Sequence, residues 1–272
     1  MIFTEKLDKA MERNKSLVCV GLDPDPGRIP EGISVSDFNR EIISATSDLV
    51  CAYKPNLAFY EAMGEEGHKA LRQTLRHIPE NIPVIADAKR NDIGNTAAAY
   101  ARAIFEDLGC DACTVNPYLG LDSIEPFASY QDRGIFVLCR TSNPGATDFQ
   151  DLQCRYGKDY LPLFQIVAMK VSEWNTRGNI GLVIGATYPG ELGIIRKAHP
   201  DTLFLVPGIG SQGGDVAQAV HHGANAQGKG MVINSSRKIL YASGGKDFAA
   251  AARSATETLR TEINHHLANP VA

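Results

Sequence analysis

Short apolar runs rich in β-branched residues recur eight times along this 272-residue chain, and this repetition restricts its possible folds. The runs lie at 16–23, 49–55, 82–89, 112–118, 134–140, 180–187, 203–210 and 230–236. Polar or turn-forming residues follow each run, which is typical of buried strands in a parallel sheet. Helix-like stretches separate most of the runs, at 36–47, 69–76, 95–108, 160–177, 190–198 and 214–222.

Eight strands that alternate with helices predict an α/β fold, a (β/α)8 TIM barrel, with a doubly wound parallel sheet as the alternative. There is no linker and no shift in composition, so we expect residues 1–272 to form a single TIM-barrel domain. Residues 1–16 look helical. The last helix is the clearest, because it places these residues on one face: Phe248, Ala252, Ala255, Leu259 and Ile263. The long segment 143–160 is predicted to be an active-site loop and an insertion.

The composition argues against several classes of protein. The net charge is −4 with no long run of one sign, so we expect no nucleic-acid-binding surface. No apolar run approaches the length of a membrane span, and the charged N-terminus does not resemble a signal peptide. Six scattered cysteines, one pair of them in a C-x-x-C at 110–113, are expected to be buried free thiols in a reducing cytoplasm.

Charged side chains collect where three successive predicted strands end. Asp23 ends the first strand, Lys54 the second, and Asp87 and Lys89 the third. Residues two apart in an extended strand point to the same face, so Asp87 and Lys89 should both face the mouth of the barrel. For one residue a structural ion pair is the better interpretation. For the whole set at the carboxyl ends of strands, where this fold carries its active sites, we favour catalysis.

A glycine-rich stretch, PGIGSQGG at 207–214, follows the seventh strand. Glycines can mark only a tight turn, but the loops after strands seven and eight usually bind phosphate in this fold. We therefore expect backbone N–H groups and a helix N-terminus to face an anion, with Gln212 and Arg237 as further donors.

Two other motifs are rejected. GANAQGKG at 223–230 lacks the hydroxyl residue of a P-loop and precedes a strand instead of following one. None of the seven histidines falls at a predicted strand end, which argues against a histidine-ligated metal or a histidine base.

The segment DAKRNDIGNT at 87–96 closely resembles the D-x-K-x-x-D-I-x-x-T signature of the orotidine 5′-phosphate decarboxylase family. Five further elements occur in the order of that family: Asp23 in VGLDPDP, Lys54 in YKPN, SNPGA at 142–146, PGIGSQGGD at 207–215 and NSSR at 234–237. The long segment after SNPG is similar to the longer bacterial subgroup. Asn91 departs from the small residue expected at that position.

The resemblance implies conversion of orotidine 5′-monophosphate to UMP and carbon dioxide, the last step of de novo pyrimidine biosynthesis, without a metal or organic cofactor. Lys89 would donate the proton to C6 of the pyrimidine, beside Asp87. The other implied contacts to substrate come from Lys54 and Asp23 at the ribose, Ser142 at the pyrimidine, and Gln212, Arg237 and the glycine-rich loop at the phosphate. Pro144 and Gly213 would also bind substrate.

The resemblance also implies a homodimer with two shared active sites. Asp92, Ile93 and Thr96 would enter the site of the partner in trans, and Asp92 would hold Lys89 there. The alternative role for Asp92 is that of a helix N-cap.

Three other functions stay open at this point. The first is a magnesium-dependent sugar-phosphate decarboxylase or synthase on a related barrel, although Lys54 stands where its acidic metal ligand should be. The second is a Schiff-base aldolase, disfavoured because neighbouring aspartates keep a lysine charged. The third is a non-catalytic phosphate-binding barrel. Segments 142–158 and 208–214 are the candidates for a loop that closes over substrate.

Overall fold

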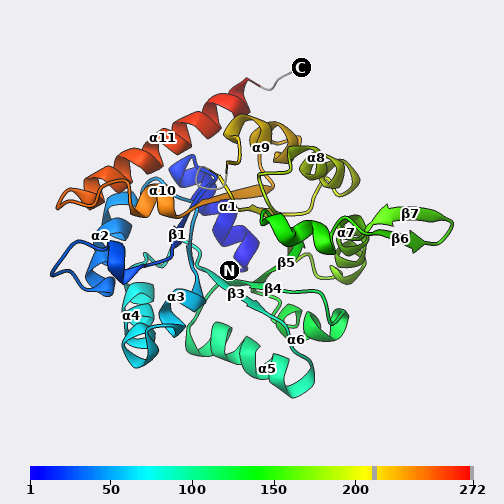
Figure 1. The fold of residues 1–272 in the computed structure, drawn as a ribbon, viewed down its shortest axis with the longest axis horizontal. Helices are drawn as coiled ribbons and strands as arrows, with labels where there is room; N and C mark the ends of the chain where they lie inside the picture. Colours follow the sequence, from blue (N-terminus) through cyan, green and yellow to red (C-terminus); the bar gives the residue numbers. More distant parts are fainter. Residues whose placement is uncertain (210–212, 270–272) are drawn as a thin grey trace.

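Eight parallel strands form a barrel in the computed structural model, which describes residues 1–209 and 213–269 (Figure 1). The strands are β1 (Val18–Leu22), β2 (Ala52–Pro55), β3 (Ile85–Arg90), β4 (Ala112–Val115), β5 (Gly134–Arg140), β8 (Ile180–Ile184), β9 (Phe204–Val206) and β10 (Met231–Ser235). Their order is β2-β1-β10-β9-β8-β5-β4-β3. Parallel bridges from Tyr53 to Val84 and from Asn56 to Asp87 join β2 to β3. The TIM barrel is confirmed and the doubly wound alternative is wrong.

Helices surround the strands, and Figure 1 shows them as an outer ring. They are α2 (Val35–Thr46), α3 (Leu57–Glu61), α4 (Gly64–His77), α5 (Gly94–Arg102), α6 (Glu125–Ala128), α7 (Leu163–Trp174), α8 (Pro189–Ala198), α9 (Val216–Gly223), α10 (Arg237–Leu240) and α11 (Phe248–Ala268). A π-helical turn, Ala103–Asp107, continues α5. None of the helices in the described ranges is both long and apolar enough to span a bilayer.

The first helix, α1 (Phe3–Asn14), packs against the amino-terminal end of the barrel. The ring of Phe3 contacts Phe136 edge-on, with ring centroids 5.9 Å apart. The Lys6 Nζ lies 2.8 Å from the carboxylate of Asp111, just before β4. Because α1 occupies this end, the carboxyl end of the barrel is the one left for a site.

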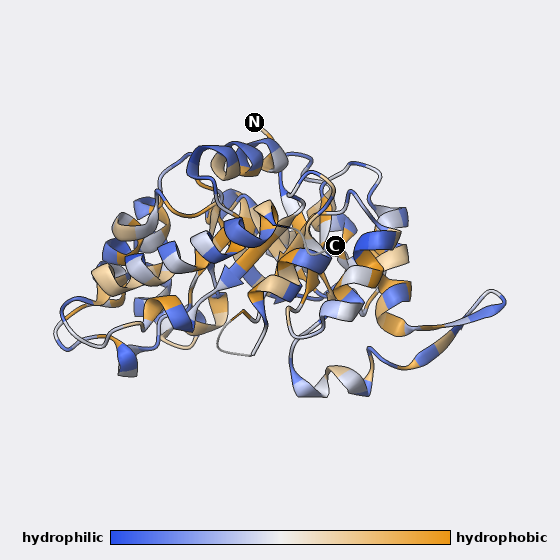
Figure 2. Cartoon of the chain, turned by 90° about the horizontal axis from the view of Figure 1, so that it is seen from above, coloured by the Kyte–Doolittle hydropathy of each residue, from blue (hydrophilic) through white to orange (hydrophobic). Residues whose placement is uncertain are grey.

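The insertion after β5 forms structure that the sequence did not reveal. The 3-10 turn Pro144–Asp148 comes first, followed by an antiparallel hairpin of β6 (Gln153–Tyr156) and β7 (Asp159–Pro162). Figures 1 and 2 show this hairpin extending away from the barrel. The predicted helix at 160–177 is wrong in its first residues, because Tyr160 and Leu161 pair with β6 and the helix begins after Pro162.

Five of the six cysteines are buried and all six are free, with Cys154 in the hairpin partly exposed. Most strands of the barrel are buried throughout, unlike those of the hairpin, and Figure 2 shows the apolar residues concentrated in the barrel. The C-x-x-C pair at 110–113 belongs to this core, which confirms buried free thiols.

Arg196 of α8 holds the connections around β9 and β10 together. Its side chain is 8% exposed and stacks on Phe204, with the guanidinium carbon 3.7 Å from the ring centroid. Its donors reach the carbonyl oxygens of Gly223, His199, Pro200, Thr202 and Gly230 at 2.7–3.3 Å. This one side chain therefore satisfies five backbone acceptors.

We predict that Arg196→Ala destabilises the protein by about 3 kcal/mol, because it removes five hydrogen bonds to backbone carbonyl groups and the stacking on Phe204. Urea unfolding followed by circular dichroism measures the change. Lys197→Ala, on the exposed side of the same helix, is the control and should change the free energy of unfolding by less than about 0.5 kcal/mol. Equal stability of the two variants would contradict this role for Arg196.

Candidate active site

A cavity of about 530 Å³ lies at the carboxyl ends of the strands. Its two sides differ in chemistry. Asp23, Lys54 and Asp87 line it from β1–β3, whereas Leu138 of β5 and Val183 of β8 form part of an apolar wall. The volume falls in the usual range for small-ligand sites, and the mixed lining suits a ligand with a flat apolar part and a charged part.

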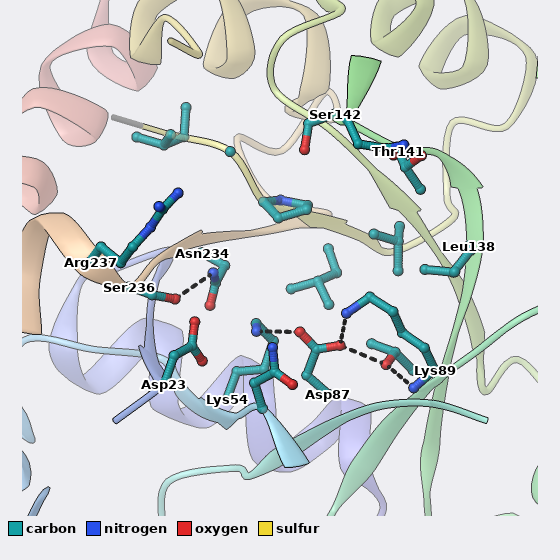
Figure 3. A pocket seen from close by; sticks show the side chains of 18 of the residues that line it. Asp23, Lys54, Asp87, Lys89, Leu138, Thr141, Ser142, Asn234, Ser236 and Arg237 are labelled. Carbon is teal, nitrogen blue, oxygen red and sulfur yellow. Dashed lines mark hydrogen bonds and ion pairs between the residues drawn. The ribbon is translucent and has the colours of Figure 1, made fainter. Parts of the chain in front are cut away.

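The carboxylate of Asp87 lies between two ammonium groups. Its Oδ2 is 2.7 Å from the Lys54 Nζ and its Oδ1 is 2.5 Å from the Lys89 Nζ (Figure 3). The exposed fraction of the side chain is 10% for Asp87 and 4% for Lys54, but 49% for Lys89. Asp87 therefore joins one buried lysine to one that stays accessible from the cavity.

The two buried members of this set stay ionised. Burial alone would raise the pKa of Asp87, but the charges of Lys54 and Lys89 outweigh burial and hold it well below its usual range. Burial likewise works to lower the pKa of Lys54, and the charges of Asp87 and Asp23 raise it above its usual value. The predicted array of alternating charges is present in the fold.

Lys89 reaches Asp87 by a route that the sequence did not predict. The extended backbone expected at this point is wrong, because Lys89 has a left-handed φ of 46° and the β3–β4 register shifts between Ala86 and Arg90. Thr114 of β4 supports the irregularity. Its Oγ1 accepts the N–H groups of Ala88 and Lys89 at 3.0 Å and donates to the Asp87 Oδ1 at 3.0 Å. A non-glycine residue held in this conformation at a cavity is a feature of functional sites.

A second set of polar side chains lies at the ends of the neighbouring strands β1 and β10. Asp23 and Asn234 both line the cavity, and each has a buried Oδ1 without a hydrogen-bond partner. Figure 3 shows the two side chains near Ser236, to which Asn234 donates at 3.4 Å. Unpaired buried acceptors are costly without a ligand, so this part of the cavity suits a donor such as a sugar hydroxyl.

The described residues that were predicted to bind an anion lie along the rim after β9 and β10. Arg237 lines the cavity at the start of α10. The described ends of the glycine-rich segment meet, because Gly214 donates to the Gly208 oxygen at 3.2 Å and a Cβ at Gly214 would lie 2.8 Å from that oxygen. The N-terminus of α9 differs from the expected anion site, since the Asp215 side chain caps it by accepting from Gln218 at 2.9 Å.

Most of the remaining predicted residues that the structure describes do not line the cavity of their own chain. Ser142 does line it, whereas Pro144 and Gly213 do not. Asp92, Ile93 and Thr96 lie beyond β3, with Ile93 51% exposed. The N-cap alternative for Asp92 is wrong, because its Oδ1 accepts from the adjacent Ile93 N–H at 2.8 Å and Ile93 is the cap residue of α5. Gln212 lies outside the described residues.

Several cavity residues carry no charge and were missed as site residues. They are Asn56, Phe59, Thr114, Thr141, Asn143, Gln150, Asn234 and Ser236. Five of them lie in the same short motifs as predicted residues, YKPN, TSNPG and NSSR, which was the available signal. Thr114 gave no such signal, because its role depends on pairing between β3 and β4.

Comparison with known proteins agrees with this geometry. A model of the orotidine 5′-phosphate decarboxylase / HUMPS family matches residues 16–254. An orotidine 5′-phosphate decarboxylase of Dehalococcoides mccartyi is 54% identical, covering 98% of each chain. One from Herpetosiphon aurantiacus is 49% identical, covering 97% of this chain and all of the relative. The structure of Leishmania donovani OMP decarboxylase superposes with a TM-score of 0.85 at 40% identity, covering 98% of this chain and 99% of that one.

The matched region contains every strand of the barrel and every charged residue of the cavity. The chain therefore belongs to the orotidine 5′-phosphate decarboxylase / HUMPS family.

Proposed function

We propose that this protein is a carboxy-lyase that converts orotidine 5′-monophosphate to UMP and carbon dioxide, the last step of de novo pyrimidine biosynthesis. The observation that carries the proposal is the Asp87 carboxylate held between Lys54 and Lys89 at the mouth of the barrel. The names of curated relatives of about 50% identity support the same activity.

The reaction breaks the bond between C6 and the carboxylate carbon, and the electron pair of that bond stays on C6. The Lys89 ammonium supplies the positive charge beside that carbon and then donates its proton to C6. Because its side chain is 49% exposed, Lys89 can regain a proton from solvent after product leaves. Asp87 orients the ammonium, and the partner's Asp92 would hold it from the other side.

Binding groups are arranged around this centre. Asp23 and Lys54 would hold the ribose hydroxyl groups, and Ser142 the pyrimidine. Arg237, Gln212 and the backbone of the glycine-rich loop, including Gly213, would bind the phosphate, with Pro144 near the base. Phosphate binding far from the reacting carbon can organise the site before chemistry begins.

The alternatives are less compatible with the cavity. A magnesium-dependent relative would need an acidic ligand at the end of β2, where Lys54 is instead buried and paired with Asp87. A Schiff-base lysine must be neutral, whereas the charges around Lys54 raise its pKa. The non-catalytic barrel is separated from the enzyme by experiment below.

A homodimer would complete the site. Four large apolar side chains, at the start of α5 and in the segment after β4, are each at least 39% exposed: Ile93, Tyr118, Leu119 and Leu121. Large exposed apolar side chains that gather on one surface are typical of a protein–protein contact. We propose that these side chains pack against a second copy, so that Asp92, Ile93 and Thr96 reach the cavity of the partner.

We further propose that residues 1–272 form one domain in the cytoplasm. One hydrophobic core runs from Phe3 to Ile263, which supports the single domain. Five buried free thiols support a reducing compartment.

The first prediction concerns chemistry. Lys89→Ala should lower the rate of loss of orotidine 5′-monophosphate absorbance by at least ~10³-fold, because it removes the proton donor and the charge beside C6. The assay contains EDTA, and UMP is identified as the product. UMP binding by the variant, measured by calorimetry, should persist. No turnover by folded wild type, or unchanged turnover by Lys89→Ala, would overturn the proposal.

The second prediction concerns pH. The pKa of Asp87 is lower in the folded protein than in the unfolded chain, so its pairing stabilises the fold above about pH 4 and loses effect as pH falls further. Asp87→Asn should therefore destabilise the protein by about 3 kcal/mol at pH 7, where it leaves Lys54 buried with one partner fewer.

This difference should shrink as the pH falls from about 5 to 3, measured by urea unfolding at each pH. Glu80→Gln, at an exposed acid of the same charge, is the control and should show no such trend. A difference that stays constant down to pH 3 would contradict the assignment.

The third prediction concerns the dimer. Lys89→Ala and Asp92→Ala are each expected to be inactive. If Asp92 acts in trans, a mixed dimer has one site with both defects and one wild-type site. An equimolar, fully exchanged mixture should recover about a quarter of wild-type activity, because half of the dimers are mixed. No recovery, with exchange verified by native mass spectrometry, would show that both residues act within one chain.

A further inference from the structure

A directional chain of hydrogen bonds crosses the segment that follows β5. The Gln150 Oε1 accepts the Thr141 backbone N–H at 2.9 Å, and the Gln150 Nε2 donates to the Thr141 Oγ1 at 2.8 Å. The Thr141 hydroxyl in turn donates to the Asn143 Oδ1 at 2.7 Å. All three side chains line the cavity.

The polarity of this chain follows from its first member. A backbone N–H can only donate, so the oxygen of the Gln150 amide must face it and the nitrogen must face the Thr141 hydroxyl. That hydroxyl accepts from Gln150, which leaves its single hydrogen for Asn143. The Asn143 oxygen is thereby occupied, and its Nδ2 is turned away from Thr141 with its hydrogens available as donors.

Contacts within the segment hold these residues in place. Arg140, the last residue of β5, is 1% exposed and its Nη2 lies 3.2 Å from the Asp151 carboxylate. Ala146 is 3% exposed, and its carbonyl oxygen accepts from the Gln150 N–H at 2.8 Å. Gln150 therefore meets Thr141 in a fixed position, and the polarity of the chain is built into the fold.

The apolar lining of the cavity indicates which group the Asn143 Nδ2 can bind. Leu138 and Val183 also line the cavity and give it an apolar surface suited to the face of a flat ring. The edge of such a ring must then be satisfied by polar groups, and the edge of a pyrimidinedione carries two carbonyl oxygens, which are acceptors.

We propose that Asn143 donates a hydrogen bond from Nδ2 to a carbonyl oxygen of the pyrimidine, and that Thr141 and Gln150 are positioning residues that fix Asn143 as a donor. The inference rests on the proposed function and adds to it a residue that selects the base.

Two variants of the full chain test this assignment. Asn143→Ala removes the donor. Gln150→Glu keeps the shape of the side chain but reverses the direction of the hydrogen bond to the Thr141 hydroxyl. The carboxylate accepts from both the N–H and the hydroxyl of Thr141, so the hydroxyl no longer donates to Asn143. Thr147→Ala lies in the same segment but takes no part in these hydrogen bonds, and it is the control.

Calorimetry measures the dissociation constants of UMP and of ribose 5-phosphate, which lacks the base. We expect each of the two variants to weaken UMP binding about tenfold and to leave ribose 5-phosphate binding unchanged. Gln150→Glu should add little to Asn143→Ala in the double variant, because both act through one donor. Thr147→Ala should bind both ligands like wild type.

The other outcomes distinguish a failure of the Asn143 assignment from a failure of the proposed function. UMP binding unchanged in Asn143→Ala would overturn the base contact. UMP binding lost in Asn143→Ala but retained in Gln150→Glu would overturn the positioning role of Gln150. Equal weakening of both ligands would show that the segment acts only on the shape of the cavity. Failure of wild type to bind UMP would instead count against the proposed function itself.

Discussion

The contact between Asp87 and its two lysines is the interaction on which the rest of the site depends. A carboxylate with 10% of its side chain exposed is costly to ionise, and Lys54 and Lys89 offset that cost from opposite sides. The buried lysine keeps the aspartate charged, and the charged aspartate holds the accessible lysine at the cavity. Removing any one of the three charges changes the environment of the other two.

The barrel makes this contact possible because its parallel strands end together. β2 brings Lys54 beside β3, and Thr114 of β4 holds β3 where its backbone turns left-handed at Lys89. Three neighbouring strands therefore share the task of positioning one ammonium group. The left-handed backbone at Lys89 is held by the hydroxyl of Thr114 on the neighbouring strand. A residue supported by a strand in this way is placed more firmly than one in a flexible loop.

The cavity divides the proposed substrate into parts with separate requirements. Charged groups gather along β1–β3, an apolar wall is formed from β5, β8 and β9, and the rim after β9 and β10 carries Arg237. A reaction that leaves an electron pair on carbon needs a fixed positive charge in surroundings poor in water. In the proposed complex the apolar wall would limit the water near the base, and the distant phosphate site would supply binding energy without adding charge there.

The sequence by itself determined the barrel and most of its charged site. Eight apolar runs with polar endings are local signals, and Asp23, Lys54, Asp87 and Lys89 stand at those endings whatever the details of packing. Only the tertiary structure decided how Lys89 reaches Asp87, since its left-handed backbone depends on Thr114 from another strand. The tertiary structure also decided three other features: the hairpin of β6 and β7, the Asp215 cap on α9, and the direction of the hydrogen bonds among Thr141, Gln150 and Asn143. Hydrophobic periodicity records which residues are buried, whereas these features depend on which polar groups meet after burial, and a single sequence carries no local trace of that.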